Sequence, residues 1–243
     1  MHRFFVSPAD LTHDTFALSA EESHHCLSVL RHQVGDRLTL FDGRGHEATG
    51  AIARVEGKLA QIKIQQRATT PPLRCRVTLV QAIPKGKNMD LVVQKAVELG
   101  VTTIAPILSE RTVVSLDSEE TSRKQEKWQT LAVEACKQCG QNYIPEVLAP
   151  QTLKRFFETK AKDELMLVAS LQPDAKPIKT VLTESSALPA SVSVLVGPEG
   201  DFTPAELGLA KSSGCQPITL GPIILRTETA AIYCLSVLGH ELY

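Results

Sequence analysis

The sequence has no apolar run long enough to cross a membrane, and its first residues, MHRFFVSPAD, contain no hydrophobic region of a signal peptide. It has no excess of one charge, because 26 basic residues stand against 27 acidic ones. This balance excludes a protein that binds nucleic acid through general positive charge, so any such contact must come from a local patch. The six cysteines are spread along 243 residues and are expected to be reduced core thiols, not a disulfide framework. We therefore expect a cytoplasmic protein.

Common catalytic and metal-binding motifs are also missing. The sequence contains no GxSxG elbow, no HExxH motif and no Walker pattern. Cys136 and Cys139 form a CxxC pair, but they lie in an expected helix without a second CxxC pair or a nearby histidine. His24 and His25 are adjacent, so on a helix their side chains point in different directions. We therefore predict no metal site and interpret the two cysteines as packing residues.

The most informative stretch lies close to the C-terminus. Residues 192–196 form a short, β-branched apolar run that is typical of a buried strand, and the loop Gly197-Pro198-Glu199-Gly200 ends it. A helix then follows, because Thr203 suits the N-cap, Pro204 the first helical position and Glu206 the end of a capping box. The pattern predicts a strand, a glycine loop and a helix in that order.

The same order of elements then recurs. A strand over residues 217–220 ends at Gly221-Pro222. A last helix begins near Thr227, and its apolar residues fall on one face: Ala231, Cys234, Leu235, Leu238 and Leu242. One Gly-Pro loop alone is more often plain turn chemistry. Two such loops together predict a ligand site, because parallel strands bind ligands at their carboxyl ends.

The rest of the chain divides into two regions. From Arg76 onward, strands alternate with helices, which predicts a parallel sheet with helices on both faces. Before it, short strands joined by tight turns, and a helix capped by Ser19 and Glu22, indicate an antiparallel meander or a small barrel. Between the two regions, residues 67–73, RATTPPL, are expected to form a stiff, extended connector that marks the domain boundary.

The paired loops also carry a family resemblance. GPEG followed by LGPIILRTETAA resembles the signature of the SPOUT superfamily of methyltransferases, and specifically the RsmE family of 16S ribosomal RNA uridine-N3 methyltransferases. The resemblance extends through KGKNMDLVVQKAVELGV, EACKQCGQNYIPE and HHCLSVLRHQVGDRLTLFDGRG, so it covers nearly the whole chain. It implies an α/β fold with a SPOUT domain over residues 73–243, whose parallel sheet contains a deep trefoil knot, and a PUA-like RNA-binding β-barrel over residues 1–70.

The resemblance also implies an activity. Members transfer a methyl group from S-adenosylmethionine to N3 of a uridine in 16S ribosomal RNA, in the small ribosomal subunit, and act as homodimers. The residues expected to bind the cofactor are Val196, Gly197, Gly200, Leu220, Gly221, Ile224, Leu225 and Arg226. Two alternatives stay open: a SPOUT enzyme that acts on transfer RNA or a ribose 2′-hydroxyl, and a non-catalytic RNA-binding or assembly protein of the same fold.

The uridine N3–H is a weak acid, so the reaction needs either stabilisation of negative charge on the uracil or a base. Arg226 is the candidate for stabilising that charge, and Glu228, Glu199 or Asp201 for the base. A structural salt bridge from Arg226 to Glu199 or Glu228 is the alternative.

Three basic residues are candidates for RNA contacts. Arg3 and Arg31 lie in family-like contexts, MHRFF and SVLR, and Lys85 is one of four positive charges in a short span. The chain departs from the family pattern elsewhere, because family members usually carry arginine at the positions of Ile223, Gln141 and Asn88.

Overall fold

The structure, a computed structural model, describes residues 2–111, 117–184 and 187–243. Contacts divide the chain into two compact units. Unit 1 comprises Met1–Pro72 and Val133–Ile144, and unit 2 comprises Leu73–Ala132 and Pro145–Tyr243. By contacts, unit 1 therefore includes a segment from the middle of the chain. The boundary near residues 70–73 stays a prediction.

Unit 2 is built on a sheet in which every pair of strands is parallel. Its strands are, in sheet order, β11 (Lys176–Pro177), β13 (Gln216–Thr219), β10 (Leu165–Ala169), β12 (Ser191–Val196), β6 (Arg76–Ala82), β7 (Thr103–Leu108) and β8 (Glu146–Val147), and β9 (Gln151–Thr152) also pairs with β7. The central strands are mostly apolar and almost wholly buried, as expected for a sheet covered on both faces.

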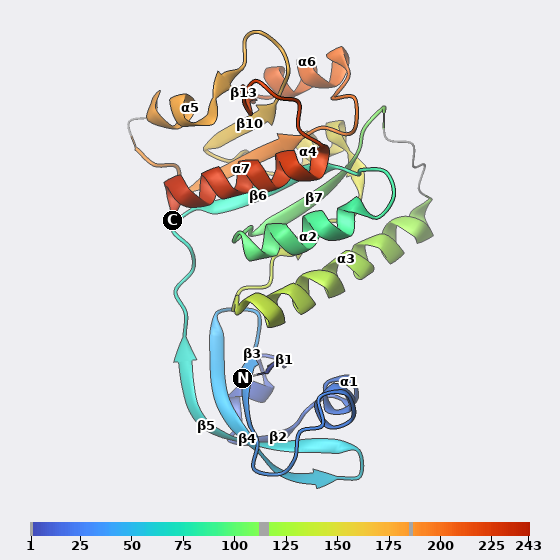
Figure 1. The fold of residues 1–243 in the computed structure, drawn as a ribbon, viewed down its shortest axis with the longest axis vertical. Coiled ribbons are helices and arrows are strands. Elements are labelled where there is room, and N and C mark those ends of the chain that lie inside the picture. Colours follow the sequence, from blue (N-terminus) through green and yellow to red (C-terminus); the bar gives the residue numbers. More distant parts are fainter. Residues whose placement is uncertain (1, 112–116, 185–186) are drawn as a thin grey trace. The chain divides into compact units, whose positions relative to one another are not determined.

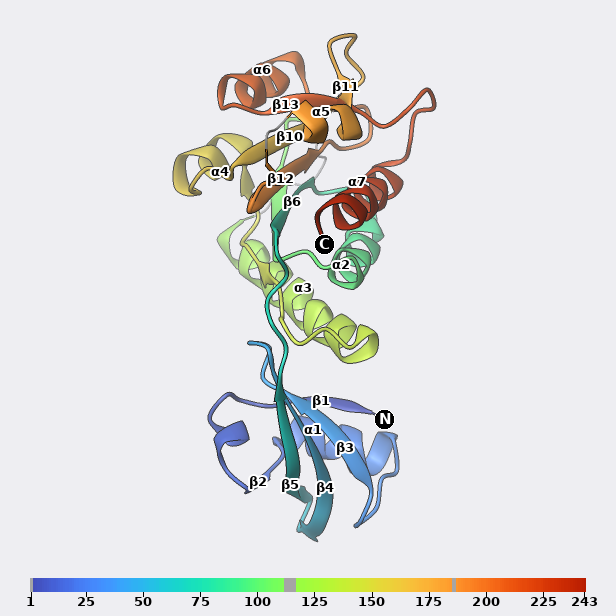
Figure 2. The ribbon, with the colours of Figure 1, turned by 90° about the vertical axis from the view of Figure 1, so that its left-hand side faces the viewer.

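Helices cover both faces of this sheet, as the sequence predicts. Figure 2 shows α2 (Asn88–Glu98) and α7 (Thr227–Leu242) on one face, and α4 (Leu153–Thr159) and α6 (Pro204–Ser212) on the other. The latter two contribute Leu153, Phe156, Leu207 and Ala210 to one core cluster with the sheet. All five apolar residues predicted on one face of α7 are buried. The remaining helices of the unit are α5 (Ile178–Glu184) and most of α3 (Ser118–Cys139).

Unit 1 contains a five-stranded sheet with the order β1-β3-β4-β5-β2 (Figure 1). Its strands are β1 (Arg3–Phe5), β2 (Thr15–Ala17), β3 (Arg37–Phe41), β4 (His46–Glu56) and β5 (Leu59–Thr69). The predicted antiparallel pairs are present, but β1 lies parallel to β3, so the sheet is not a simple meander. Strand β5 also runs to Thr69, so the expected connector begins inside a strand.

A short helix, α1 (Ala20–His24), precedes a π-helical turn (His25–Val29) in unit 1. Only half of the predicted capping box forms. The Ser19 hydroxyl accepts a hydrogen bond from the Glu22 N–H, but the Glu22 carboxylate forms an ion pair with Lys137 on α3. The carboxylate is thus held by an ammonium group from the mid-chain segment, which the local sequence could not indicate.

Among the described residues, no helix is both long and apolar enough to span a bilayer. The trefoil knot implied by the family resemblance stays a prediction.

Candidate functional site

The carboxyl ends of three neighbouring strands in unit 2 meet the start of the last helix. Strand β10 lies between β12 and β13, with Val168 opposite Leu195 and Ala169 opposite Ile218. The loops that follow these strands surround a cavity of about 410 Å³. Its walls are residues 169–171, 196–201, 220–221, 223–227 and 230. The position agrees with the site predicted from the two glycine loops.

All the residues expected to bind the cofactor border this cavity. The loop after β12 contributes Val196, Gly197 and Gly200, and the loop after β13 contributes the others. Ile224 is 76% exposed and its neighbour Ile223 is 73% exposed, so this second loop presents apolar side chains to solvent. The structure thus brings the predicted set together around one cavity.

Two hydrogen bonds join the start of α7 to the loop after β12 and to strand β6. The Thr227 hydroxyl donates to the Gly197 carbonyl over 2.6 Å and accepts from Gln81 Nε2 over 3.0 Å. Gln81 is fully buried at the end of β6, opposite Val196, which explains how it reaches this loop. Its Oε1 atom is buried without a hydrogen-bond partner in the described parts of the chain. Thr227 and Gln81 therefore fix the loop against the first turn of α7.

Sequence reasoning missed both Gln81 and the role of Thr227. The signal for Gln81 was a glutamine near the end of the mostly apolar strand Arg76–Ala82. A buried amide needs hydrogen-bond partners, but the strand itself does not say where they come from.

Hydrogen bonds between side chains and backbone groups also hold the GPEG loop, residues 197–200. The Glu199 carboxylate accepts from the Lys85 N–H, at 3.2 and 3.4 Å to its two oxygens. The guanidinium of Arg111 donates to the carbonyls of Gly200 and Asp201. Asp201 has a φ of +68° and accepts a hydrogen bond from the Phe202 N–H at Oδ1. Arg111 is a contributor that the sequence analysis did not identify.

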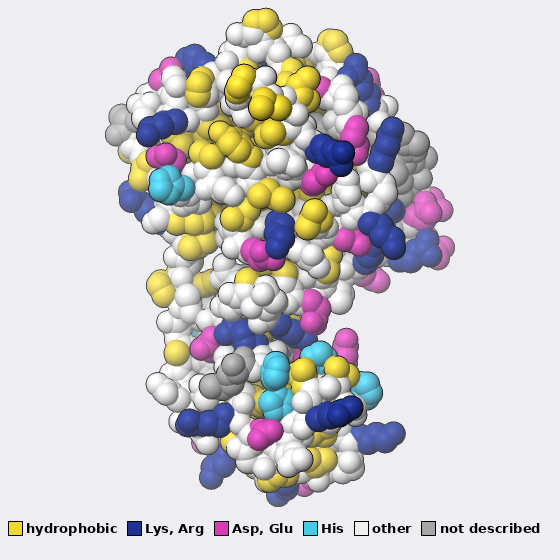
Figure 3. All heavy atoms as spheres, viewed as in Figure 1, with side chains coloured by type: hydrophobic (Ala, Val, Ile, Leu, Met, Phe, Trp, Pro, Cys, Tyr) yellow, Lys and Arg dark blue, Asp and Glu magenta, His cyan; other side chains and the backbone are white. Residues whose placement is uncertain are grey.

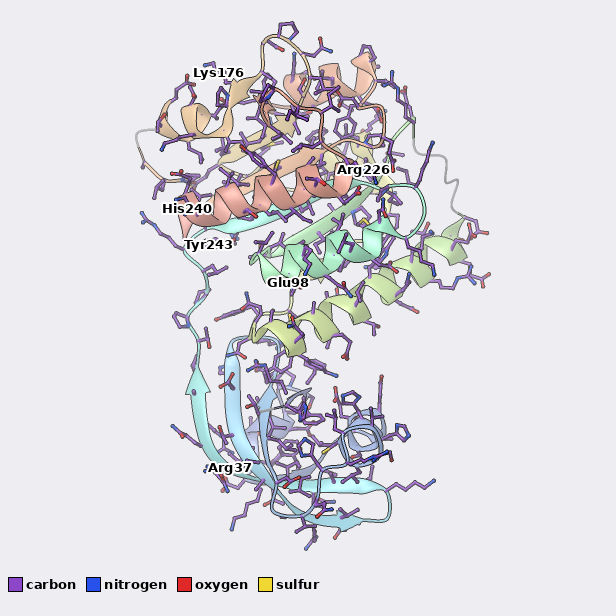
Figure 4. All side chains as sticks on the ribbon, viewed as in Figure 1. Arg37, Glu98, Lys176, Arg226, His240 and Tyr243 are labelled. Carbon is purple, nitrogen blue, oxygen red and sulfur yellow. The ribbon has the colours of Figure 1, made fainter. Side chains whose placement is uncertain are left out.

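Arg226 lies at the N-terminal end of α7, where Figure 4 labels it, and borders the cavity. It is exposed and forms no ion pair within the described residues. Glu199 contacts Lys85 instead, and the nearest hydrogen-bond partner of Glu228 is Asn88 Nδ2 at 3.5 Å. The alternative of a structural salt bridge from Arg226 to either glutamate therefore finds no support in this geometry.

The candidate RNA-binding residues differ in their surroundings. The Arg3 side chain is only 13% exposed, pairs with Glu47 at 2.6 Å, donates to Asn142 and lies over the Phe41 ring. This geometry gives Arg3 an internal role in unit 1. Arg31 is exposed, with a φ of +58°, and Lys85 is exposed.

The packing interpretation of the CxxC pair is right for Cys136 and wrong for Cys139. Cys136 is fully buried, and burial raises the pKa of its thiol to about 12, so it stays protonated at neutral pH. Cys139 is exposed. In the described parts of the chain, no group of three or more histidine, cysteine or acidic residues could hold a metal ion.

The fold is that of an RNA methyltransferase. A family model described as "RNA methyltransferase domain" matches residues 71–239, which include every residue that borders the cavity. A second model, "RNA methyltransferase PUA domain", matches residues 18–65.

Known relatives narrow the class further. The chain is 32% identical to "Ribosomal RNA small subunit methyltransferase E" of Synechocystis, over 97% of this chain and 76% of the relative. It is 30% identical to the Bacillus subtilis protein of the same name, over 99% and 97% of the two chains. The chain therefore belongs to the ribosomal RNA small subunit methyltransferase E family.

Solved structures agree with this family. The structure of the Neisseria gonorrhoeae protein of that name, bound to S-adenosyl methionine, matches with a TM-score of 0.88 and 32% identity, over 99% of this chain and 98% of that one. A Legionella pneumophila protein in complex with the bound cofactor SAM matches with a TM-score of 0.87 and 36% identity, over 98% and 97% of the two chains.

The Thr227 hydroxyl gives a test of how the cavity is held together. Thr227→Val keeps the shape but removes the hydroxyl that donates to the Gly197 carbonyl and accepts from Gln81 Nε2, which keeps only its bond to the Ala82 carbonyl. It should therefore lower the free energy of unfolding by about 1–3 kcal/mol. Thr227→Ser keeps the hydroxyl, so its free energy of unfolding should fall by clearly less. Urea denaturation of the two variants and the wild type measures the difference. Equal stability of Thr227→Val and the wild type would show that these bonds contribute nothing.

Proposed function

We propose that this chain transfers a methyl group from S-adenosylmethionine to N3 of a uridine in 16S ribosomal RNA, as a cytoplasmic enzyme of ribosome biogenesis. The observation that carries the proposal is the cavity, because the two signature loops form its walls and place at its edge an arginine that has no ion pair among the described residues. The names of the similar proteins point to small-subunit ribosomal RNA as the substrate. Two similar structures were solved with the same methyl donor bound.

The residues around the cavity fit an adenosyl ligand. Glycines let the backbone approach a ligand closely, and an added Cβ at Gly197 would already lie 3.2 Å from Asp201 Oδ1 and the Phe202 nitrogen. Leu220, Ile224 and Leu225 supply apolar surface, while backbone amides and carbonyls supply hydrogen bonds. When bound, S-adenosylmethionine would supply the reactive methyl group, and these residues would hold it in place for transfer.

Gly221 is needed for its backbone conformation. Crowding is not the reason, because an added Cβ here would meet no atom within 4 Å. The φ of Gly221 is +113°, a conformation that residues with a side chain rarely adopt.

Gly221→Val should therefore distort the loop after β13 and weaken binding of S-adenosylmethionine by about tenfold or more. Gly208→Ala is a matched control, because Gly208 lies on α6 with open space around it. Isothermal calorimetry measures both affinities. If Gly221→Val binds as tightly as Gly208→Ala, the loop is not part of the cofactor site.

Arg226 is proposed to stabilise the negative charge that develops on a uracil carbonyl as N3 loses its proton. It cannot be the base, because a guanidinium does not deprotonate in proteins. Glu228, Glu199 and Asp201 remain the candidates for that role, and Asp201 also borders the cavity. Glu228 is half-buried in the first turn of α7, next but one to Arg226, and Glu199 borders the cavity.

Arg226→Ala should slow single-turnover methyl transfer by roughly a hundredfold or more, while cofactor affinity changes little. Arg155→Ala, which removes an exposed arginine on α4, is the control for general loss of charge. The rate is measured on purified small subunits, with folding checked by circular dichroism. A normal rate in folded Arg226→Ala, together with a lower melting temperature, would indicate a structural arginine.

RNA binding is proposed to involve Arg31 and Lys85, which are exposed cations on unit 1 and unit 2 respectively. Arg3 is proposed to support this indirectly, since its guanidinium holds Glu47 and Asn142 in place.

A homodimer formed through unit 2 is also proposed. Large apolar side chains are exposed there, with Leu171 at 63%, Ile223 at 73% and Tyr233 at 43%. Figure 3 shows hydrophobic side chains gathered on the face that carries α7. Exposed apolar surface of this kind is typical of an interface between protein chains.

Light scattering at micromolar concentration should give the mass of a dimer, and Ile223→Asp combined with Tyr233→Asp should shift it towards the monomer. A wild-type protein that is monomeric and fully active would rule out the dimer.

The reaction itself is tested by mapping its product. Purified protein is incubated with S-adenosylmethionine and either small subunits or naked 16S ribosomal RNA from cells that lack this protein, and methylated nucleosides are identified by mass spectrometry. N3-methyluridine in 16S ribosomal RNA is expected. A methylated ribose, a methylated transfer RNA in a parallel incubation, or no methylation would favour one of the two alternatives.

A further inference from the structure

The residues that follow β7 contact the end of the GPEG loop. One nitrogen of the Arg111 guanidinium, Nη1, donates to the Gly200 carbonyl and, over 3.4 Å, to the Asp201 carbonyl. A Cβ added at Gly200 would lie 3.9 Å from the same nitrogen, so the guanidinium lies against this turn. Gly200 and Asp201 both border the cavity of unit 2, whereas Arg111 lies outside its walls.

Gly200 and Asp201 form a left-handed turn, with φ values of +91° and +68°. Glycine adopts a positive φ readily, but a residue with a side chain does so uncommonly, even though aspartate tolerates it better than most. Two local bonds support the turn, because the Asp201 N–H donates to the Pro198 carbonyl over 3.0 Å and Asp201 Oδ1 accepts from the Phe202 N–H over 2.7 Å. The carbonyls of Gly200 and Asp201 take no part in these bonds, and Arg111 donates to them instead.

The backbone beside Arg111 is fixed by the Glu206 carboxylate. Glu206 is only 8% exposed, and its Oε1 accepts from the Glu110 N–H over 2.9 Å. Its Oε2 accepts from the Thr203 N–H over 3.0 Å at the start of α6. One buried carboxylate therefore joins the residue before Arg111 to the helix that follows the left-handed turn. Arg111 reaches the turn from a backbone that is itself held in place.

The conformation of this turn affects how tightly the cavity binds a ligand. When only a fraction of the molecules has the wall in the binding conformation, the observed affinity falls by that fraction. A hydrogen bond from a charged donor stabilises a structure more than a bond between neutral groups does. The bonds from Arg111 should therefore raise the fraction of molecules in which the turn is formed before the ligand arrives.

We propose that Arg111 is a positioning residue for S-adenosylmethionine, which holds the left-handed turn of Gly200 and Asp201 in the conformation that completes the pocket. Arg111 acts through the turn and not by touching the cofactor, because it lies outside the cavity walls. The inference rests on the proposed function, in which this cavity binds the methyl donor.

Isothermal calorimetry with S-adenosylmethionine tests the proposal. Arg111→Ala should weaken binding by about tenfold, the lower end of the effect of a charged hydrogen bond, because the side chain is exposed. Arg111→Lys should keep most of the affinity, since a single nitrogen of Arg111 makes both bonds and an ammonium group can replace it. Arg155→Ala, which removes an exposed arginine on α4, is the matched control and should bind as the wild type does.

Kinetics separate positioning from a general structural role. With purified small subunits, Arg111→Ala should raise the KM for S-adenosylmethionine by the same factor, while the rate at saturating cofactor and the melting temperature stay close to those of the wild type. The turn itself is tested in the Asp201→Gly background, because glycine adopts the positive φ without help. In that background, Arg111→Ala should weaken cofactor binding by a clearly smaller factor than it does in the wild type.

The proposal is overturned if Arg111→Ala binds the cofactor as tightly as Arg155→Ala, or if Arg111→Lys is as weak as Arg111→Ala. An equally large effect of Arg111→Ala in the Asp201→Gly background would also overturn it, because the turn would not be the link. A lower melting temperature with a lower rate at saturating cofactor would indicate a structural arginine. The proposed function fails separately: a wild-type protein that binds S-adenosylmethionine but methylates no ribosomal RNA refutes the enzyme, while the affinities of the variants still decide the role of Arg111.

Discussion

The hydrogen bond from the Thr227 hydroxyl to the Gly197 carbonyl is the contact on which the cavity of unit 2 depends most. It joins the first residue of α7 to the loop after β12, across 30 residues of sequence. Gln81 completes the arrangement, because the strand register places it opposite Val196 and its amide reaches Thr227. The register thus sets where the loop leaves the sheet, Thr227 sets where the helix starts, and the cavity is the space between them.

Much of this site could be predicted because its sequence signals are local. The capping box of Thr203 and Glu206 forms with both of its hydrogen bonds, and Pro204 begins the helix as expected. The last helix starts at Thr227, where the sequence placed it. Parallel strands that end in glycine loops must present those loops at one edge of the sheet, so the expected cofactor residues border a single cavity.

The features that sequence reasoning missed depend on residues far apart in the chain. Gln81 and Thr227 are separated by 146 positions, and nothing near either of them names the other. Arg3 resembled an RNA contact in its local context, but Glu47 and Asn142 occupy its guanidinium. The role of Gly221 follows from its positive φ and not from crowding, since the space around it is open. The sequence alone does not give that angle. In each case the tertiary structure decides the role of a residue whose type alone allows several.

The mid-chain segment Val133–Ile144, which belongs to unit 1 by its contacts, has a consequence for synthesis on the ribosome. The first 72 residues emerge early, but the residues that complete their packing follow only after β6, α2 and β7 have been made. Until then Glu22 has no Lys137, and Gly43 and Gly45 have no support from Ile144 and Tyr143. The first unit can therefore complete its packing only after part of the second unit has been synthesised. The order of synthesis thus links the folding of two units that each have their own core.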